Sequence, residues 1–143
     1  MIEDILGVKK LIFTVCALEM IHSSSIILYD LTYMDNANIR RGKSTNHMVY
    51  GHDKVILASV VLLMRRLEIV ASDSSIPGHI KNELLLHFTR VVGAQGMTGG
   101  QFIDLKYSNA RFDGKYLDYI HPHKTTSIYI LAGLSVVIIV RSN

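Results

Sequence analysis

The sequence has one cysteine, Cys16, and only two prolines among its 143 residues. One thiol forms no internal disulfide, and no zinc-finger spacing of Cys and His is present, which fits a reducing or redox-neutral compartment. Charge is scarce as well, because charged residues make up 19% of the chain and the net charge is +3. Apart from short pairs the basic residues are scattered, so we expect no nucleic-acid partner.

The chain also lacks a recognisable targeting segment and a very long apolar run. Residues 1–10 carry Glu3 and Asp4 in place of the basic start of a secretory signal. The apolar run Ser127–Val140 is shorter than the roughly 20 residues that cross a bilayer upright. We therefore expect a buried core helix there and no membrane partner, with a shallow membrane anchor as the alternative.

What is present is an apolar composition arranged at helical spacing. Hydrophobic residues make up 49% of the chain, as in one globular domain. Residues 11–31 repeat apolar side chains at helical intervals without proline or glycine, and this predicts a long helix that ends near 32–38. Residues 36–51 predict a loop. Residues 53–69 predict a second helix, and their apolar content on all sides suits the centre of a bundle.

A third helix is predicted over residues 80–107, with Pro77 just inside its start. It contains four glycines, which cost stability in a helix and therefore need a packing or ligand reason: Gly93, Gly96, Gly99 and Gly100. A fourth helix begins near Lys115 and continues into the apolar run, with Pro122 in its first turns or at a kink. Long helices with no internal repeat and no alternating strand pattern predict an all-α bundle of long antiparallel helices.

The chemistry is concentrated in residues 29–42, YDLTYMDNANIRRG, which are followed by KSTNHMVYG. Carboxylates such as Asp30 and Asp35 hold Mg²⁺, and an arginine pair such as Arg40 and Arg41 grips phosphate oxygens. These residue types are also common on a solvated helix end, which is the ordinary alternative. On an ideal helix the two aspartates lie about 140° apart, so they share an ion only if the helix bulges or ends between them.

This region resembles the first aspartate-rich motif of plant-type geranylgeranyl diphosphate synthases, D-D-L-P-x-M-D-N-D-D-L-R-R-G-K-P-T-N-H. Further stretches that resemble the family follow in its order: VILA at 55–58, GGQFIDL at 99–105 and YIHPHKT at 119–125. The resemblance identifies the chain as the central part of one incomplete polyprenyl-synthase-like domain over residues 1–143. The fold that it implies is a partial isoprenoid-synthase helical bundle.

The resemblance implies Mg²⁺-dependent condensation of isopentenyl diphosphate with an allylic diphosphate. Asp30 and Asp35 match the magnesium ligands of the family. Arg40 matches the arginine that contacts the allylic diphosphate, and Arg41 matches the one that contacts isopentenyl diphosphate. These two substrates are therefore the expected small-molecule partners, and Mg²⁺ is the expected cofactor.

The later motifs imply further roles in the same reaction. Lys124 and Thr125 match contacts to the allylic diphosphate, with Lys124 countering the charge of the leaving group. Gln101 and Asp104 match the family's G-G-Q-x-x-D, which lines the reaction cavity, and Gln101 is the expected substrate contact. The plant relatives imply a plastid location, although the chain shows no transit peptide.

The departures from the family pattern predict impaired chemistry. Tyr29 stands in place of the first aspartate of the pair, and a neutral phenol is a poor magnesium ligand. Other positions where the family residue is replaced are Leu28, Thr32, Ala37, Asn38 and Val60. Nothing here matches the family's upstream basic segment or its second aspartate-rich helix.

Three interpretations follow from this pattern. The first is an impaired prenyltransferase, and the second is a non-catalytic partner that docks on an intact synthase. The third is a degenerate duplicate without a stable fold. A homodimer, or a heterodimer with an intact synthase, is the expected assembly.

Overall fold

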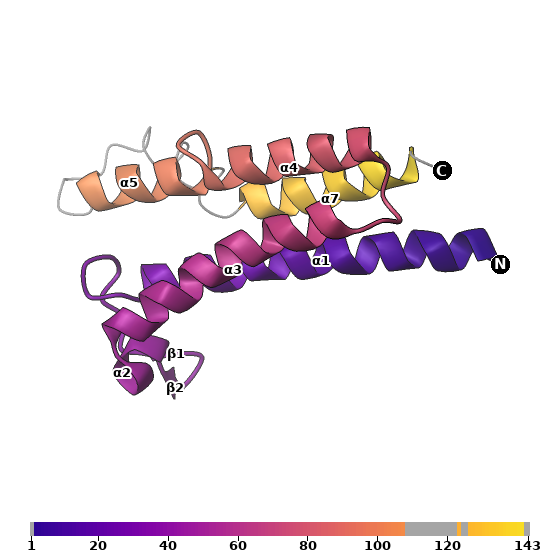
Figure 1. Ribbon diagram of the computed structural model, residues 1–143. Helices are drawn as coiled ribbons and strands as arrows, with labels where there is room; N and C mark the ends of the chain where they lie inside the picture. Colours follow the sequence, from indigo (N-terminus) through magenta and orange to yellow (C-terminus); the bar gives the residue numbers. More distant parts are fainter. Residues whose placement is uncertain (1, 108–122, 124–125, 142–143) are drawn as a thin grey trace. The chain divides into compact units, whose positions relative to one another are not determined.

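A computed structural model describes residues 2–107, 123 and 126–141, with side chains described from residue 11 onward. Its elements, in chain order, are α1 (Ile2–Tyr29), β1 (Ile39–Arg40), β2 (Lys43–Ser44), α2 (Asn46–Tyr50), α3 (His52–Ser72), α4 (Gly78–Val92), α5 (Met97–Tyr107) and α7 (Ser127–Val140) (Figure 1). In this part of the chain the strands are two residues long, and most of the other residues are helical. The predicted all-α fold is confirmed.

The chain divides into two compact units. The first unit combines residues 1–15 with 70–143, and the second unit consists of residues 16–69. The boundary between them falls inside α1 at one point and near the end of α3 at the other.

In the first unit, α4 packs against α7 and α5 (Figure 1). The buried side chains of α4 are Ile80, Leu84 and Phe88, which recur every four residues and so form one face. The buried face of α7 is spaced in the same way and includes Leu131 and Ile138. The predicted core helix at 127–140 is therefore a helix with one buried face, while its other face is exposed.

The predicted third helix over 80–107 is wrong in its continuity, because α4 ends at Val92 and α5 begins at Met97. A β-carbon on Gly96 would lie 1.9 Å from the carbonyl oxygen of Val91. One on Gly99 would lie 1.9 Å from the carbonyl oxygen of Ala94. Gly96 and Gly99 therefore have a packing reason, because backbone approaches backbone in a tight corner between the two helices.

In the second unit, α3 has one buried face and one exposed apolar face. Val55, Ser59 and Arg66 are buried, and at about 100° per residue they lie on one side of the helix. The opposite side carries exposed apolar side chains, which are Ile56, Leu57, Val60, Val61 and Met64. The helix was predicted to sit at the centre of a bundle. In the described part of the chain only one of its faces is covered.

One stretch of α1, Leu11–Tyr29, is long and apolar enough to cross a membrane by length and composition, and 22% of its most apolar window is buried. The core helix of a soluble protein passes the same test, so this stretch alone is weak support for a membrane role.

Candidate functional site

The carboxyl end of α1 sets the position of the first aspartate. The helix ends at Tyr29, and the Asp30 amide still donates to the Ile26 carbonyl at 3.0 Å. The chain then folds back, since the Asp35 amide donates to the Tyr29 carbonyl at 2.8 Å. The Ala37 amide likewise donates to the Asp30 carbonyl at 3.2 Å. The helix has therefore ended before Asp35, so the 140° separation expected on a continuous helix does not apply.

A two-residue hairpin positions the arginine pair. Strands β1 and β2 pair Arg40 with Lys43, and the turn between them consists of Arg41 and Gly42. Both turn residues have positive φ, 51° and 76°, which matches the twist of a tight hairpin. This conformation is uncommon for a side chain as large as arginine. The turn leaves Arg41 exposed at the tip, while Arg40 reaches back to the end of α1.

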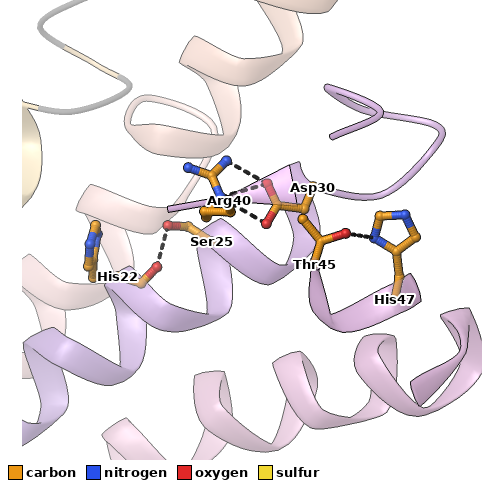
Figure 2. A network of polar contacts seen from close by, with 6 residues as sticks. All are labelled: His22, Ser25, Asp30, Arg40, Thr45 and His47. Carbon is orange, nitrogen blue, oxygen red and sulfur yellow. Dashed lines mark hydrogen bonds and ion pairs between the residues drawn. The ribbon is translucent and has the colours of Figure 1, made fainter. Parts of the chain in front are cut away.

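Arg40 and Asp30 form a two-nitrogen ion pair (Figure 2). The Arg40 Nε–H donates to Asp30 Oδ1 and Oδ2, both at 2.8 Å, and Nη2 donates to Oδ1 at 2.5 Å. The Asp30 side chain is 5% exposed and the Arg40 side chain 40% exposed. The hydrogen bond to Asp30 raises the pKa of the Arg40 guanidinium, helped by the charges of Asp30 and Asp35 and opposed by partial burial.

These carboxylates, as placed, do not fit a Mg²⁺ ion. Both oxygens of Asp30 already accept hydrogen bonds from Arg40, and Asp35 is exposed. Tyr29 offers a phenol in place of a carboxylate. Within residues 2–107, 123 and 126–141, no three His, Cys, Asp or Glu residues group to hold a metal. That Asp30 and Asp35 ligate Mg²⁺ stays a prediction, which this geometry does not favour.

The remaining predicted site residues lie elsewhere. Gln101 is buried on α5 and Asp104 is half-buried three residues later, and both belong to the first unit. Asp30, Asp35, Arg40 and Arg41 belong to the second. Lys124 and Thr125 lie outside the described residues. The structure brings Asp30 and Arg40 together, and a shared pocket with the other residues stays a prediction.

A pair of histidines beside the hairpin was not singled out from the sequence. His47 is 4% exposed, and the Thr45 hydroxyl lies 3.2 Å from its Nδ1 (Figure 2). Its ring centroid is 5.0 Å from that of His52, and His52 Nε2 lies 3.2 Å from the Thr32 hydroxyl. These contacts tie the loop after α1 to α2 and the start of α3. The signal was in the motif KSTNH, whose histidine had been treated only as part of the resemblance.

Comparison with known proteins decides the family. The model of the family described as polyprenyl synthetase matches residues 5–143. The chain belongs to the polyprenyl synthetase family. Among its relatives, a geranylgeranyl diphosphate synthase of Cyanophora paradoxa is 42% identical over 125 residues, which are 85% of this chain and 41% of that protein. Geranylgeranyl pyrophosphate synthase 3, chloroplastic, of Arabidopsis thaliana is 40% identical and covers 83% of this chain and 34% of that protein.

Solved structures agree with this membership. A geranyltransferase of Helicobacter pylori has a TM-score of 0.83 at 27% identity, over 88% of this chain and 43% of that one. The same enzyme is also known complexed with magnesium and isoprenyl diphosphate, again with a TM-score of 0.83 at 27% identity. That match covers 88% of this chain and 41% of the solved one. This member of the polyprenyl synthetase family thus has the all-α fold of these neighbours and spans less than half of their length.

Proposed function

We propose that this chain is a geranylgeranyl diphosphate synthase-like trans-prenyltransferase of isoprenoid biosynthesis whose condensation of isopentenyl and allylic diphosphates is impaired. The observation that supports it most is the contact between Asp30 and Arg40. An acid at a helix end and a guanidinium ten residues later are folded together by the hairpin, on the motif that resembles a diphosphate site. Family membership supports the same class of reaction.

The hairpin supplies the groups that bind phosphate oxygens. Arg41 and Lys43 are exposed on the turn and β2, and Arg40 is exposed enough to reorient. A guanidinium binds two phosphate oxygens at once, which suits a diphosphate better than a single ammonium does. In this proposal the arginines hold the diphosphate groups, while the prenyl chains remain among apolar side chains.

The impairment follows from the carboxylates. Mg²⁺ is the metal named with the Helicobacter pylori relative, and it is the ion that this reaction would use. Because Tyr29 is not a carboxylate and Asp30 is engaged by Arg40, the residues present do not fit that ion. Without a well-held cation, charge on the leaving diphosphate is poorly compensated, and condensation is slow.

Restoring the missing acid tests this proposal. Purified protein is incubated with labelled isopentenyl diphosphate, farnesyl diphosphate and Mg²⁺, and prenyl products are separated by chromatography. We expect Tyr29→Asp to raise product formation by about tenfold or more over the parent chain, because it adds a ligand at the position where the family has one. Tyr29→Asn is the matched control without charge. No product from Tyr29→Asp at high protein concentration would reject the proposal.

A second candidate is a non-catalytic partner of an intact prenyl synthase, and the exposed apolar face of α3 favours it. Ile56, Leu57, Val60, Val61 and Met64 form a continuous stripe that a partner helix would cover. The test is co-purification with an intact geranylgeranyl diphosphate synthase, with Val61→Glu as the variant that breaks the stripe. Binding that survives Val61→Glu, or no binding at all, counts against this candidate.

Plastid location is part of the proposal. Four of the relatives, three from Arabidopsis thaliana and one from Capsicum annuum, are named as chloroplastic, and another from Arabidopsis thaliana is named as mitochondrial. A fluorescent fusion of the full reading frame, imaged in leaf cells, checks whether the protein reaches that compartment.

A further inference from the structure

The Asp30 carboxylate is nearly closed to solvent and already holds a cation. Its side chain is 5% exposed, and both of its oxygens accept hydrogen bonds from Arg40. A carboxylate ligates a metal ion through the same lone pairs that accept hydrogen bonds. The three contacts from Arg40 occupy three of the about four lone-pair sites of the carboxylate, so a metal ion that used both oxygens would have to displace the guanidinium.

The electrostatics around the pair also oppose a second cation. Arg40 neutralises the charge of Asp30, and Arg41 and Lys43 add two positive charges on the same hairpin. Asp35 is the other acid whose charge acts on Arg40, and it is exposed to water. A divalent ion that approaches Asp30 therefore meets a neutral pair among basic groups. Its binding becomes favourable only after the guanidinium leaves.

We propose that Arg40 is the resident cation of Asp30 and that its two-nitrogen contact excludes divalent metal ions from this carboxylate in the ligand-free protein. Removal of Arg40 leaves a desolvated anion, which is costly unless another cation replaces the arginine. The protein without Arg40 should therefore acquire a metal site that the parent chain does not have. The identity of the reaction is not needed for this claim.

Metal titration without any diphosphate tests the resident-cation claim separately from catalysis. Mn²⁺ is the probe, because it accepts oxygen ligands and its free ion is counted by electron paramagnetic resonance. We expect Arg40→Gln to bind one Mn²⁺ about tenfold or more tightly than the parent chain. The double variant Asp30→Asn with Arg40→Gln should lose that site, which assigns it to the carboxylate.

Two results would overturn the proposal. One is an Arg40→Gln protein, folded by circular dichroism, that binds Mn²⁺ no better than the parent chain. The other is a parent chain that already binds Mn²⁺ tightly and loses it in Asp30→Asn. If Arg40→Gln does not fold, Arg40→Lys decides, because a single ammonium lacks the guanidinium fork and should admit more Mn²⁺ than the parent. Because these titrations contain no diphosphate, their results can be interpreted even if the condensation assay detects no product.

Discussion

The ion pair between Asp30 and Arg40 should contribute measurably to the stability of this chain. The perturbation is a double-mutant cycle that combines Asp30→Asn, which keeps the side-chain size, with Arg40→Gln, which removes the charge and shortens the side chain. Exposed ion pairs contribute about 0.2–1 kcal/mol. Removing one partner of a buried pair costs about 3–5 kcal/mol, because a charge is left in the interior.

The structure places this pair between the two limits. Asp30 is 5% exposed, whereas Arg40 is 40% exposed and therefore partly screened by solvent. We expect Arg40→Gln to lower the free energy of unfolding by about 2 kcal/mol, because water only partly replaces the guanidinium beside the Asp30 carboxylate. Asp30→Asn should cost about 1 kcal/mol, because the amide oxygen still accepts a hydrogen bond. The coupling energy should be about 1–2 kcal/mol.

Urea unfolding followed by circular dichroism at 222 nm measures all four proteins. The parent chain must first show a cooperative transition, and its absence would favour the interpretation of a duplicate without a stable fold. Added salt should reduce the coupling only in part, because Asp30 is shielded from the ions. Additive effects, with a coupling energy below about 0.5 kcal/mol, would refute the reasoning that the observed contact is energetically real.

Three further predictions concern stability and are checked by the same unfolding assay. Gly96→Ala should destabilise the protein by about 1–3 kcal/mol, because the added β-carbon meets backbone. Gly133→Ala, in open space on α7, should stabilise it by about 0.5–1 kcal/mol. Equal effects of the two variants would contradict the close backbone approach at Gly96. Leu84→Ala should cost about 2–5 kcal/mol as a buried α4 residue, and Leu86→Ala, exposed on the same helix, less than about 1 kcal/mol. Burial lowers the pKa of Arg66 to about 10, well below its ordinary value, so above about pH 10 the unfolded chain binds more protons than the folded one. The free energy of unfolding of the parent, relative to that of Arg66→Met, should therefore be constant below about pH 10 and rise above it. A decrease above about pH 10 would contradict the lowered pKa of Arg66.

Local patterning was sufficient to predict the helices of this chain. The apolar spacing of residues 11–31 predicted a helix, which the structure describes as part of α1. The helix was expected to end near 32–38, and it ends slightly earlier, at Tyr29. The all-α class followed from the same periodicity, which depends only on neighbours within one or two turns. The predicted loop at 36–51 was right in its position, but it contains the hairpin and α2.

The candidate site was predictable in its members and not in its geometry. The residue types of Asp30 and Arg40 identified them as partners for phosphate and metal, and the resemblance identified the motif. Their direct contact depends on the turn at Arg41 and Gly42, where a non-glycine residue takes positive φ. Propensity gives no signal for that conformation in arginine, so the pairing of the two side chains was not foreseen.

The sequence by itself determined the helical class, the family and the residues that carry charge near the first motif, because periodicity and motif chemistry are properties of neighbours along the chain. Only the tertiary structure decided how these charges are used. It ended α1 at Tyr29, turned the hairpin back on that end and enclosed the Asp30 carboxylate beside Arg40. The physical reason is that burial and ion pairing depend on groups brought together through space, and a buried carboxylate takes whichever cation the fold places within reach.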